Sequence, residues 1–162
     1  MGRGVHGEIL APVTAFVSAG AGFLLAVLWF DLMFDVQVLR HREADVPEDV
    51  LASISGYYRR VTTLARPMNR LVSAAMLGTL AAIVVQIAKG DSPRWVGWAS
   101  LALVGSAVLL AGSHTVPSAV RLGRRVDPID VQSQLARSIL RDHLLCLAAI
   151  TSLLTVQLVF AA

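Results

Sequence analysis

The chain has 162 residues, of which 56% are hydrophobic and only 15% are charged, against about 25% charged residues in a typical soluble domain. The mean hydropathy is +0.66, and a soluble core of this size cannot hide so much apolar surface. These values exclude a disordered chain and favour an integral membrane protein that forms one domain over residues 1–162. The single Cys excludes a disulfide framework and a cysteine-based zinc site.

Four apolar stretches are long enough to cross a bilayer, which requires about 20 residues of helix. They cover residues 12–36, 71–88, 95–116 and 139–161. A turn that contains Gly90 and Pro93 joins the second stretch to the third. The pattern predicts an all-α fold, an up-down four-helix bundle that spans the membrane.

Two connecting segments are also predicted to be helical. Residues 47–64 open with Pro47-Glu48-Asp49 and carry apolar residues at helical spacing, and a second helix opens at Asp127-Pro128 and continues into the fourth span. Amphipathic helices of this kind lie along a membrane surface or cap a bundle.

The basic residues are unevenly distributed among the connections. Eleven lie in or beside the first and third connections, namely Arg40, Arg42, Arg59, Arg60, Arg66, Arg70, Arg121, Arg124, Arg125, Arg137 and Arg141. The other three are Arg3, Lys89 and Arg94. Because positive loops stay in the cytoplasm, we predict a plasma-membrane protein with both termini outside. The lipid bilayer is then the expected partner of the chain, and nucleic acid is not.

Small residues recur on two of the predicted spans and indicate close helix packing. Ser18, Gly22 and Ala26 repeat every four residues on the first span, and Gly105 and Gly112 lie seven apart on the third. We expect these faces to contact neighbouring helices, and they also permit a homo-oligomer.

Ionisable residues inside the spans are the candidate functional residues, because a charge inside a bilayer is costly. Asp31 and Asp35 share one face of the first span, His114 lies near the end of the third, and His143 lies near the start of the fourth. Counted from the nearest arginines at 1.5 Å per residue, all four lie about 7 to 13 Å deep, in one layer. Asp142 lies beside His143. In an alternative reading these groups are only solvated at the headgroup boundary, which suits Arg40, His41, Arg42 and Asp142.

Two carboxylates four residues apart repel each other at low dielectric, so we expect a proton or a cation between them. A carboxylate pair that faces His114 and His143 resembles the metal sites of four-helix bundles and suits iron, manganese, copper or zinc. A metal-free ion-pair cluster is an alternative, in which Asn69 adds a neutral hydrogen bond. The arginines available for it are Arg66, Arg70, Arg137 and Arg141. A haem between the two histidines is a third reading.

Four short segments, taken in order, resemble a known family. The first span ends in Trp29-Phe30-Asp31-Leu32-Met33-Phe34-Asp35, and the second opens with Arg66-Pro67-Met68-Asn69-Arg70. The third ends in Gly112-Ser113-His114-Thr115-Val116-Pro117, and the fourth opens with Leu140-Arg141-Asp142-His143-Leu144-Leu145. This order resembles the anthrone oxygenase-like family of small four-span membrane proteins. The resemblance implies a membrane oxygenase that acts on an activated aromatic carbon, and it adds Asn69, His114 and His143 to the candidate site.

We therefore predict a membrane-embedded oxidoreductase, an oxygenase for a small lipophilic aromatic substrate. Asp31, Asp35, His114 and His143 would bind a metal or act as acid and base. The residues expected to hold an anionic oxygen or to orient the carboxylates are Asn69, Arg66, Arg70 and Arg141. Two non-enzymatic functions stay open: a membrane subunit whose arginines bind anionic lipid, and a proton or ion carrier.

Overall fold

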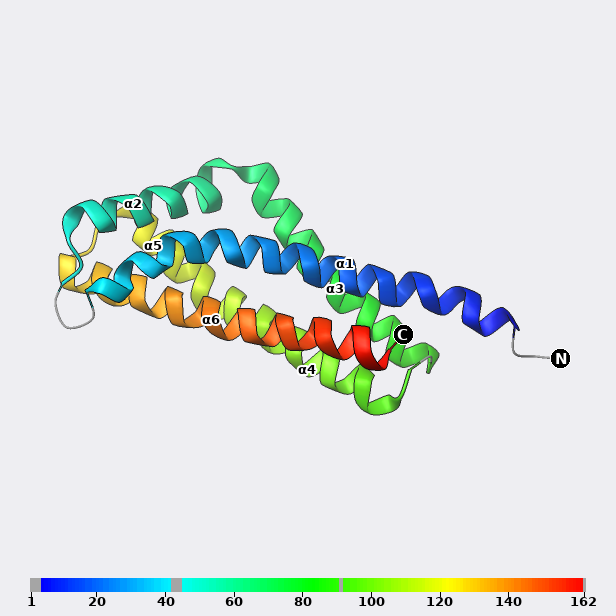
Figure 1. Ribbon diagram of the computed structural model, residues 1–162. Helices are drawn as coiled ribbons and strands as arrows, with labels where there is room; N and C mark the ends of the chain where they lie inside the picture. The colour runs from blue at the N-terminus through cyan, green and yellow to red at the C-terminus, as the bar shows by residue number, and fades with distance from the viewer. Residues whose placement is uncertain (1–3, 42–44, 91, 162) are drawn as a thin grey trace.

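The computed structural model describes residues 4–41, 45–90 and 92–161, and the regular structure within these ranges is entirely helical. Helix α1 (Gly4–Asp35) runs into a 3-10 segment (Val36–Arg40), and α2 (Glu48–Arg59) runs into a π-helical turn (Arg60–Leu64). Helix α3 (Arg66–Lys89) follows, and then α4 (Arg94–Leu110), which a π-helical turn (Ala111–Thr115) joins to α5 (Val116–Arg124). Helix α6 (Ile129–Phe160) is the last (Figure 1). The predicted all-α class is confirmed.

Proline and residues in the left-handed conformation mark the helix boundaries. Pro93 and Pro128 stand immediately before α4 and α6, where a missing backbone N–H costs nothing. Gly90 ends α3 with a φ of 69°, a conformation that a residue without a Cβ adopts at little cost. The predicted helices over residues 47–64 and from Pro128 into the fourth span are both present.

Beyond the third apolar stretch, predicted to end at about residue 116, the helical path continues to Arg124. Pro117 favours a break there, but it occupies the first turn of α5. Its missing N–H is tolerated because the preceding π-helical turn already interrupts the regular hydrogen-bond ladder.

Within the described ranges, four helical stretches are long and apolar enough to cross a membrane. They are Val13–Arg40, Pro67–Lys89, Arg94–Arg124 and Ile129–Phe160. Large apolar side chains point outward from them: Trp29 is 64% exposed, Leu77 61% and Leu109 72%. An outer surface of this kind suits lipid rather than water.

The partner of α1 and α6 changes along the length of the molecule. In one half, α1 packs against α3 and α6, and α4 packs against the same two helices. In the other half, α2 packs against α5 and also contacts α6 and α1. Figure 1 shows α3 diverging from α1 and α6 where α2 lies alongside them. The amphipathic helix α2 therefore continues the packing along α1 and α6.

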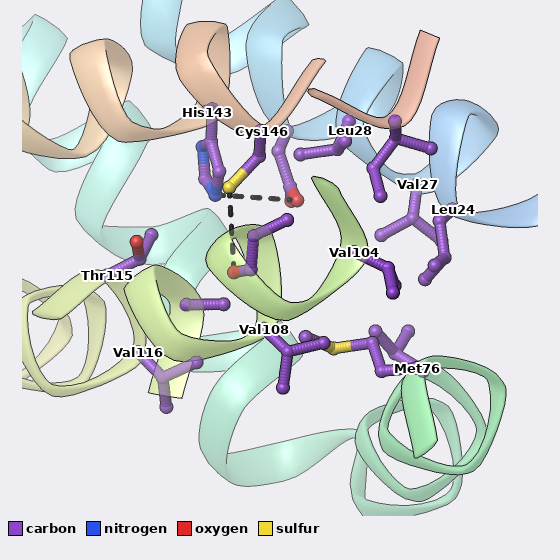
Figure 2. Close-up of a pocket in the computed structure, with 15 residues that line it drawn as sticks. Leu24, Val27, Leu28, Met76, Val104, Val108, Thr115, Val116, His143 and Cys146 are labelled. Carbon is purple, nitrogen blue, oxygen red and sulfur yellow. Dashed lines mark hydrogen bonds and ion pairs between the residues drawn. The ribbon is translucent and has the colours of Figure 1, made fainter. Parts of the chain in front are cut away.

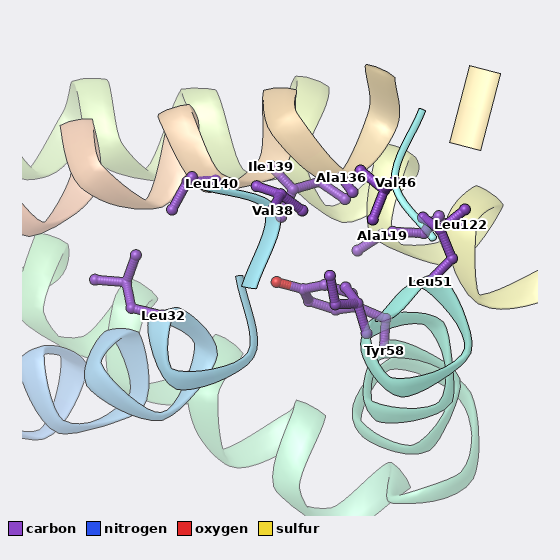
Figure 3. Close-up of a cluster of buried hydrophobic side chains, with 11 residues drawn as sticks. Leu32, Val38, Val46, Leu51, Tyr58, Ala119, Leu122, Ala136, Ile139 and Leu140 are labelled. Carbon is purple, nitrogen blue, oxygen red and sulfur yellow. The ribbon is translucent and has the colours of Figure 1, made fainter. Parts of the chain in front are cut away.

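Two hydrophobic clusters fill these two halves. The first contains Leu24 of α1, Ile83 of α3, Val104 of α4 and Ile150 of α6. The second contains Leu32, Leu51, Tyr58, Leu122 and Ile139, from α1, α2, α5 and α6 (Figure 3). Along α1 the junction between the clusters falls between Leu24 and Leu32. The candidate polar residues lie close to this junction.

The small-residue faces do not pack as expected. A Cβ built on Gly22, Gly105 or Gly112 would meet nothing within 4 Å. The close approaches lie elsewhere: a Cβ on Gly20 would stand 2.1 Å from Oγ1 of Thr79, and one on Gly97 would stand 2.6 Å from Cγ1 of Ile87. Spacing alone does not reveal the rotation of a helix about its axis, which decides which small residues face a neighbour.

Candidate functional site

A buried aspartate on α1 accepts hydrogen bonds from two other helices. Asp35 is fully buried. The Tyr58 hydroxyl of α2 donates to its Oδ1 at 2.5 Å, and Nδ1 of His143, on α6, lies 2.6 Å from its Oδ2. A carboxylate bonded to Nδ1 fixes the ring orientation and leaves Nε2 to face another group.

Nε2 of His143 faces the second aspartate. Asp31 Oδ2 lies 3.8 Å from this nitrogen, and the Tyr57 hydroxyl donates to Asp31 Oδ1 at 2.6 Å. The His143 ring is thus placed between two carboxylates that lie one helical turn apart on α1. The predicted convergence of Asp31, Asp35 and His143 is present.

Two adjacent tyrosines on α2 bond to different aspartates. The ring of Tyr57 stacks on Phe34 of α1, with ring centroids 4.1 Å apart, and its edge meets Tyr58. Burial and the charge of Asp31 raise the pKa of Tyr57 well above its usual value, and burial and the charge of Asp35 do the same for Tyr58. Both hydroxyls therefore stay protonated and donate to the carboxylates.

An apolar cavity lies beside His143 and Asp31. Its volume is about 140 Å³, and most of its lining comes from side chains such as Leu24, Val27, Val104 and Val108 (Figure 2). An apolar cavity of about 150 Å³ holds one benzene molecule. The space therefore fits a single ring, with the imidazole in its wall.

A second cavity of about 140 Å³ shares this wall. Asp31, His143 and Thr115 line both cavities, and the second is further lined by Tyr57, Tyr58 and Asn69. The polar cluster thus stands between a mainly apolar space and a space with several hydroxyl and amide groups.

His114 does not join this cluster. Its Nδ1 lies 2.6 Å from Asp142 Oδ2 on α6, and the same oxygen accepts a hydrogen bond from Thr115 at 3.0 Å. The His114 side chain is 46% exposed, whereas Asp142 is 1% exposed. The alternative reading in which Asp142 is only solvated is therefore wrong, because the π-helical turn brings His114 and Thr115 over its carboxylate.

The expected arginine partners of the aspartates lie elsewhere. Arg70 and Arg141 are exposed, and in the described ranges neither forms an ion pair with Asp31 or Asp35. Arg137 donates to the backbone oxygen of His41 at 2.7 Å, and the Arg66 side chain lies outside the described residues. The tyrosine hydroxyls and His143 are the groups that bond to the two carboxylates. Asn69 lines the second cavity, and its Nδ2 donates to the Thr62 backbone oxygen at 3.5 Å.

The expected ligand set of Asp31, Asp35, His114 and His143 is not assembled. In the part of the chain that the structure describes, no group of three or more His, Cys, Asp and Glu side chains is placed to hold a metal ion. Both oxygens of Asp35 already have partners. The two histidines bond to different carboxylates, so the paired arrangement expected for a haem is not formed either.

Sequence reasoning missed Tyr57 and Tyr58 as site residues and counted them only as apolar positions of an amphipathic helix. A buried tyrosine hydroxyl needs a hydrogen-bond partner. One signal could have identified these tyrosines: they are adjacent, and their helix follows a span that contains two aspartates. Nothing in the sequence indicates that α2 lies beside α1 at this depth.

Comparison of the chain with family models, curated proteins and solved structures finds no match. The function must therefore be argued from the geometry of these residues.

Proposed function

We propose that the chain is a membrane-embedded oxidoreductase, an oxygenase that acts on a small lipophilic aromatic substrate. The observation that carries this proposal is the pairing of His143 with the buried Asp35 beside an apolar cavity of ring size. A His whose Nδ1 is held by a carboxylate is a general base at Nε2. The family resemblance of the sequence points to the same chemistry.

The proposed reaction converts an activated methylene carbon and dioxygen into a carbonyl group and water. His143 removes one C–H proton, and the carbanion reduces dioxygen and combines with it to form a peroxide. The imidazolium returns its proton to the peroxide oxygen. Nε2 then removes the second C–H proton, and the C–H electron pair forms the carbonyl bond as the O–O bond breaks. The hydroxide that is released takes this proton from the imidazolium and leaves as water.

The surroundings of His143 suit proton removal from carbon. Asp35 stabilises the imidazolium that forms, and Tyr58 holds Asp35 in place through its other oxygen. Asp31 Oδ2 lies 3.8 Å from Nε2, so a substrate carbon that approaches Nε2 also lies near this carboxylate, whose other oxygen accepts a hydrogen bond from Tyr57. The apolar lining excludes water and strengthens these interactions.

The test is oxygen consumption by the purified protein in detergent, with a small aromatic compound that carries an activated methylene group. His143→Gln removes the base, and we expect a loss of at least about 100-fold in rate, the usual contribution of a general base. His114→Gln is the matched control, because this His also bonds to an aspartate but does not line either cavity. Equal rates for wild type and His143→Gln would refute the proposal.

The membrane arrangement that we propose is an up-down bundle whose four apolar helices each cross the plasma membrane once. It rests on the length and outward apolar surface of these helices and on the excess of arginine in the first and third connections. Both termini would lie outside. A protease site inserted after Gly90 should then be cut by protease added outside the cell. Cleavage only in inverted vesicles would show that the orientation is the opposite one.

A proton carrier is the second candidate. It is favoured by the continuous hydrogen-bonded row that joins Tyr58, Asp35 and His143, with Asp31 next in line. The other half of the bundle holds an uncharged polar cluster, in which Gln157 donates to Gln86 and Ser100. Proton flux into liposomes that is lost in Asp35→Asn, with no oxygen consumption in wild type, would favour this reading.

A further inference from the structure

A groove with basic walls lies between α2 and α5, apart from the site described above. Its volume is about 800 Å³. Arg59 and Thr63 contribute from α2 and its π-helical turn, and Arg124 contributes from the end of α5. Small residues such as Ala52 and Gly56 also line it, so the groove has room for a polar group between arginines.

The carboxylate that lines the groove, Glu48, is already neutralised. Arg125 adopts a φ of 56° at the end of α5, and its guanidinium donates to Glu48 and, at 3.4 Å, to the Ser55 hydroxyl. In the described ranges, Arg59 and Arg124 form no ion pair with a carboxylate. The groove therefore presents two positive charges that lack a protein counter-ion.

The two helices that carry these arginines are held closely together. A Cβ on Gly123 would stand 3.0 Å from the backbone nitrogen of Arg59 and 3.1 Å from its Cα. Gly123 is buried, so α2 and α5 cross here with no room for a side chain. The backbone that carries Arg59 is therefore fixed in position relative to the end of α5.

Apolar side chains stand exposed next to the arginines. Val126, which lines the groove, is 76% exposed. Leu64, one residue beyond Thr63, is 64% exposed, and Ile129 at the start of α6 is 43% exposed. The apolar stretch that can cross the membrane ends at Arg124. Basic groups bordered by exposed aliphatic groups at the end of a span match the boundary between headgroups and acyl chains.

We propose that this groove binds the phosphate of an anionic membrane lipid, with Arg59 and Arg124 as the phosphate ligands and Val126 against the acyl chains. Guanidinium groups suit phosphate because they donate planar, charge-assisted hydrogen bonds. A membrane lipid fits better than a soluble anion because the apolar groups beside the groove would otherwise be left in water. This site is independent of the oxygenase proposal.

The test uses the full chain in a neutral detergent and measures thermal unfolding against added short-chain phosphatidylglycerol. Wild type should be stabilised in a saturable way, whereas short-chain phosphatidylcholine and inorganic phosphate should have little effect. The double variant Arg59→Gln/Arg124→Gln should bind phosphatidylglycerol about 30-fold more weakly at low salt, since each basic residue near a membrane surface contributes about fivefold. The single variants should lie between the two.

The matched control is Lys89→Gln/Arg94→Gln, which removes two charges at the turn between α3 and α4. This control should bind phosphatidylglycerol as wild type does. Equal weakening in both double variants would overturn the groove as the site. Equal stabilisation by phosphatidylcholine would overturn the requirement for an anionic headgroup, and equal stabilisation by inorganic phosphate would overturn the lipid as the source.

Discussion

Replacing Tyr58 with Phe removes one hydroxyl group from the core around Asp35 and leaves the ring in place. Tyr58 is 2% exposed and packs in the hydrophobic cluster of α1, α2, α5 and α6. Its hydroxyl donates to Asp35 at 2.5 Å, and Asp35 is fully buried. The variant therefore leaves a buried carboxylate oxygen without its donor.

The size of the effect follows from the charge and burial of the acceptor. A hydrogen bond to a charged group contributes about 1.5–3 kcal/mol, and an unsatisfied buried group costs a similar amount. We expect Tyr58→Phe to lower the free energy of unfolding by about 2–3 kcal/mol. Tyr57→Phe should cost only about 1 kcal/mol, because Asp31 is less buried, with 15% of its side chain accessible, and it also borders the second cavity, where other polar groups can replace the donor.

The measurement is reversible unfolding in mixed micelles of a denaturing and a mild detergent, followed by circular dichroism. A double-mutant cycle of Tyr58→Phe with Asp35→Asn isolates the pair, and a coupling of about 1–2 kcal/mol is expected for groups in direct contact. Tyr57→Phe is the matched control on the same helix. If Tyr58→Phe costs no more than Tyr57→Phe, or if the coupling is zero, Asp35 is not held by Tyr58 as described.

Two further predictions concern the same structure. The chain has two tyrosines, and the pKa of each is raised well above 10, so no tyrosinate absorbance should appear as the pH of the folded protein passes 10. Folding raises these pKa values, so the stability that the hydroxyls contribute is complete below pH 10 and is lost as the pH rises further. Tyrosinate absorbance of the folded protein near pH 10 would contradict the raised pKa values. Gly97→Ala should cost about 1–3 kcal/mol of stability because Ile87 must move. Gly105→Ala on the same helix meets no neighbour and should instead stabilise the protein by about 0.4–1 kcal/mol. Equal thermal unfolding of the two variants would show that α3 and α4 do not meet at Gly97.

Much of the local structure could be predicted from the sequence. Long apolar runs identify the four helices, since a chain in lipid must satisfy its backbone hydrogen bonds within each segment. Proline and glycine identify the turn between α3 and α4. The burial of Asp35 and His143 could be expected as well, because ionisable groups in such runs face the protein interior.

The partners of those groups could not be predicted in this way. Arginine is the obvious counter-ion for two aspartates, but the hydroxyls of Tyr57 and Tyr58 occupy that position. The π-helical turn and the rotation of α4 direct His114 to Asp142 rather than to the aspartates of α1. Depth depends on residue number alone, whereas direction depends on how each helix is rotated and bent.

The sequence by itself therefore determined the helical class of this protein, the positions of its apolar helices and the residues that cannot face lipid. It could do so because hydrophobic periodicity and the pairing of backbone hydrogen bonds within a helix are local properties of the chain. Only the tertiary structure decided that α2 replaces α3 beside α1 and that Asp35 orients His143 against a ring-sized cavity. It also decided that Gly20 of α1, and not Gly22, meets a neighbouring helix. These features depend on the crossing and axial rotation of whole helices. Many weak packing contacts set that geometry together, and residue spacing does not encode it.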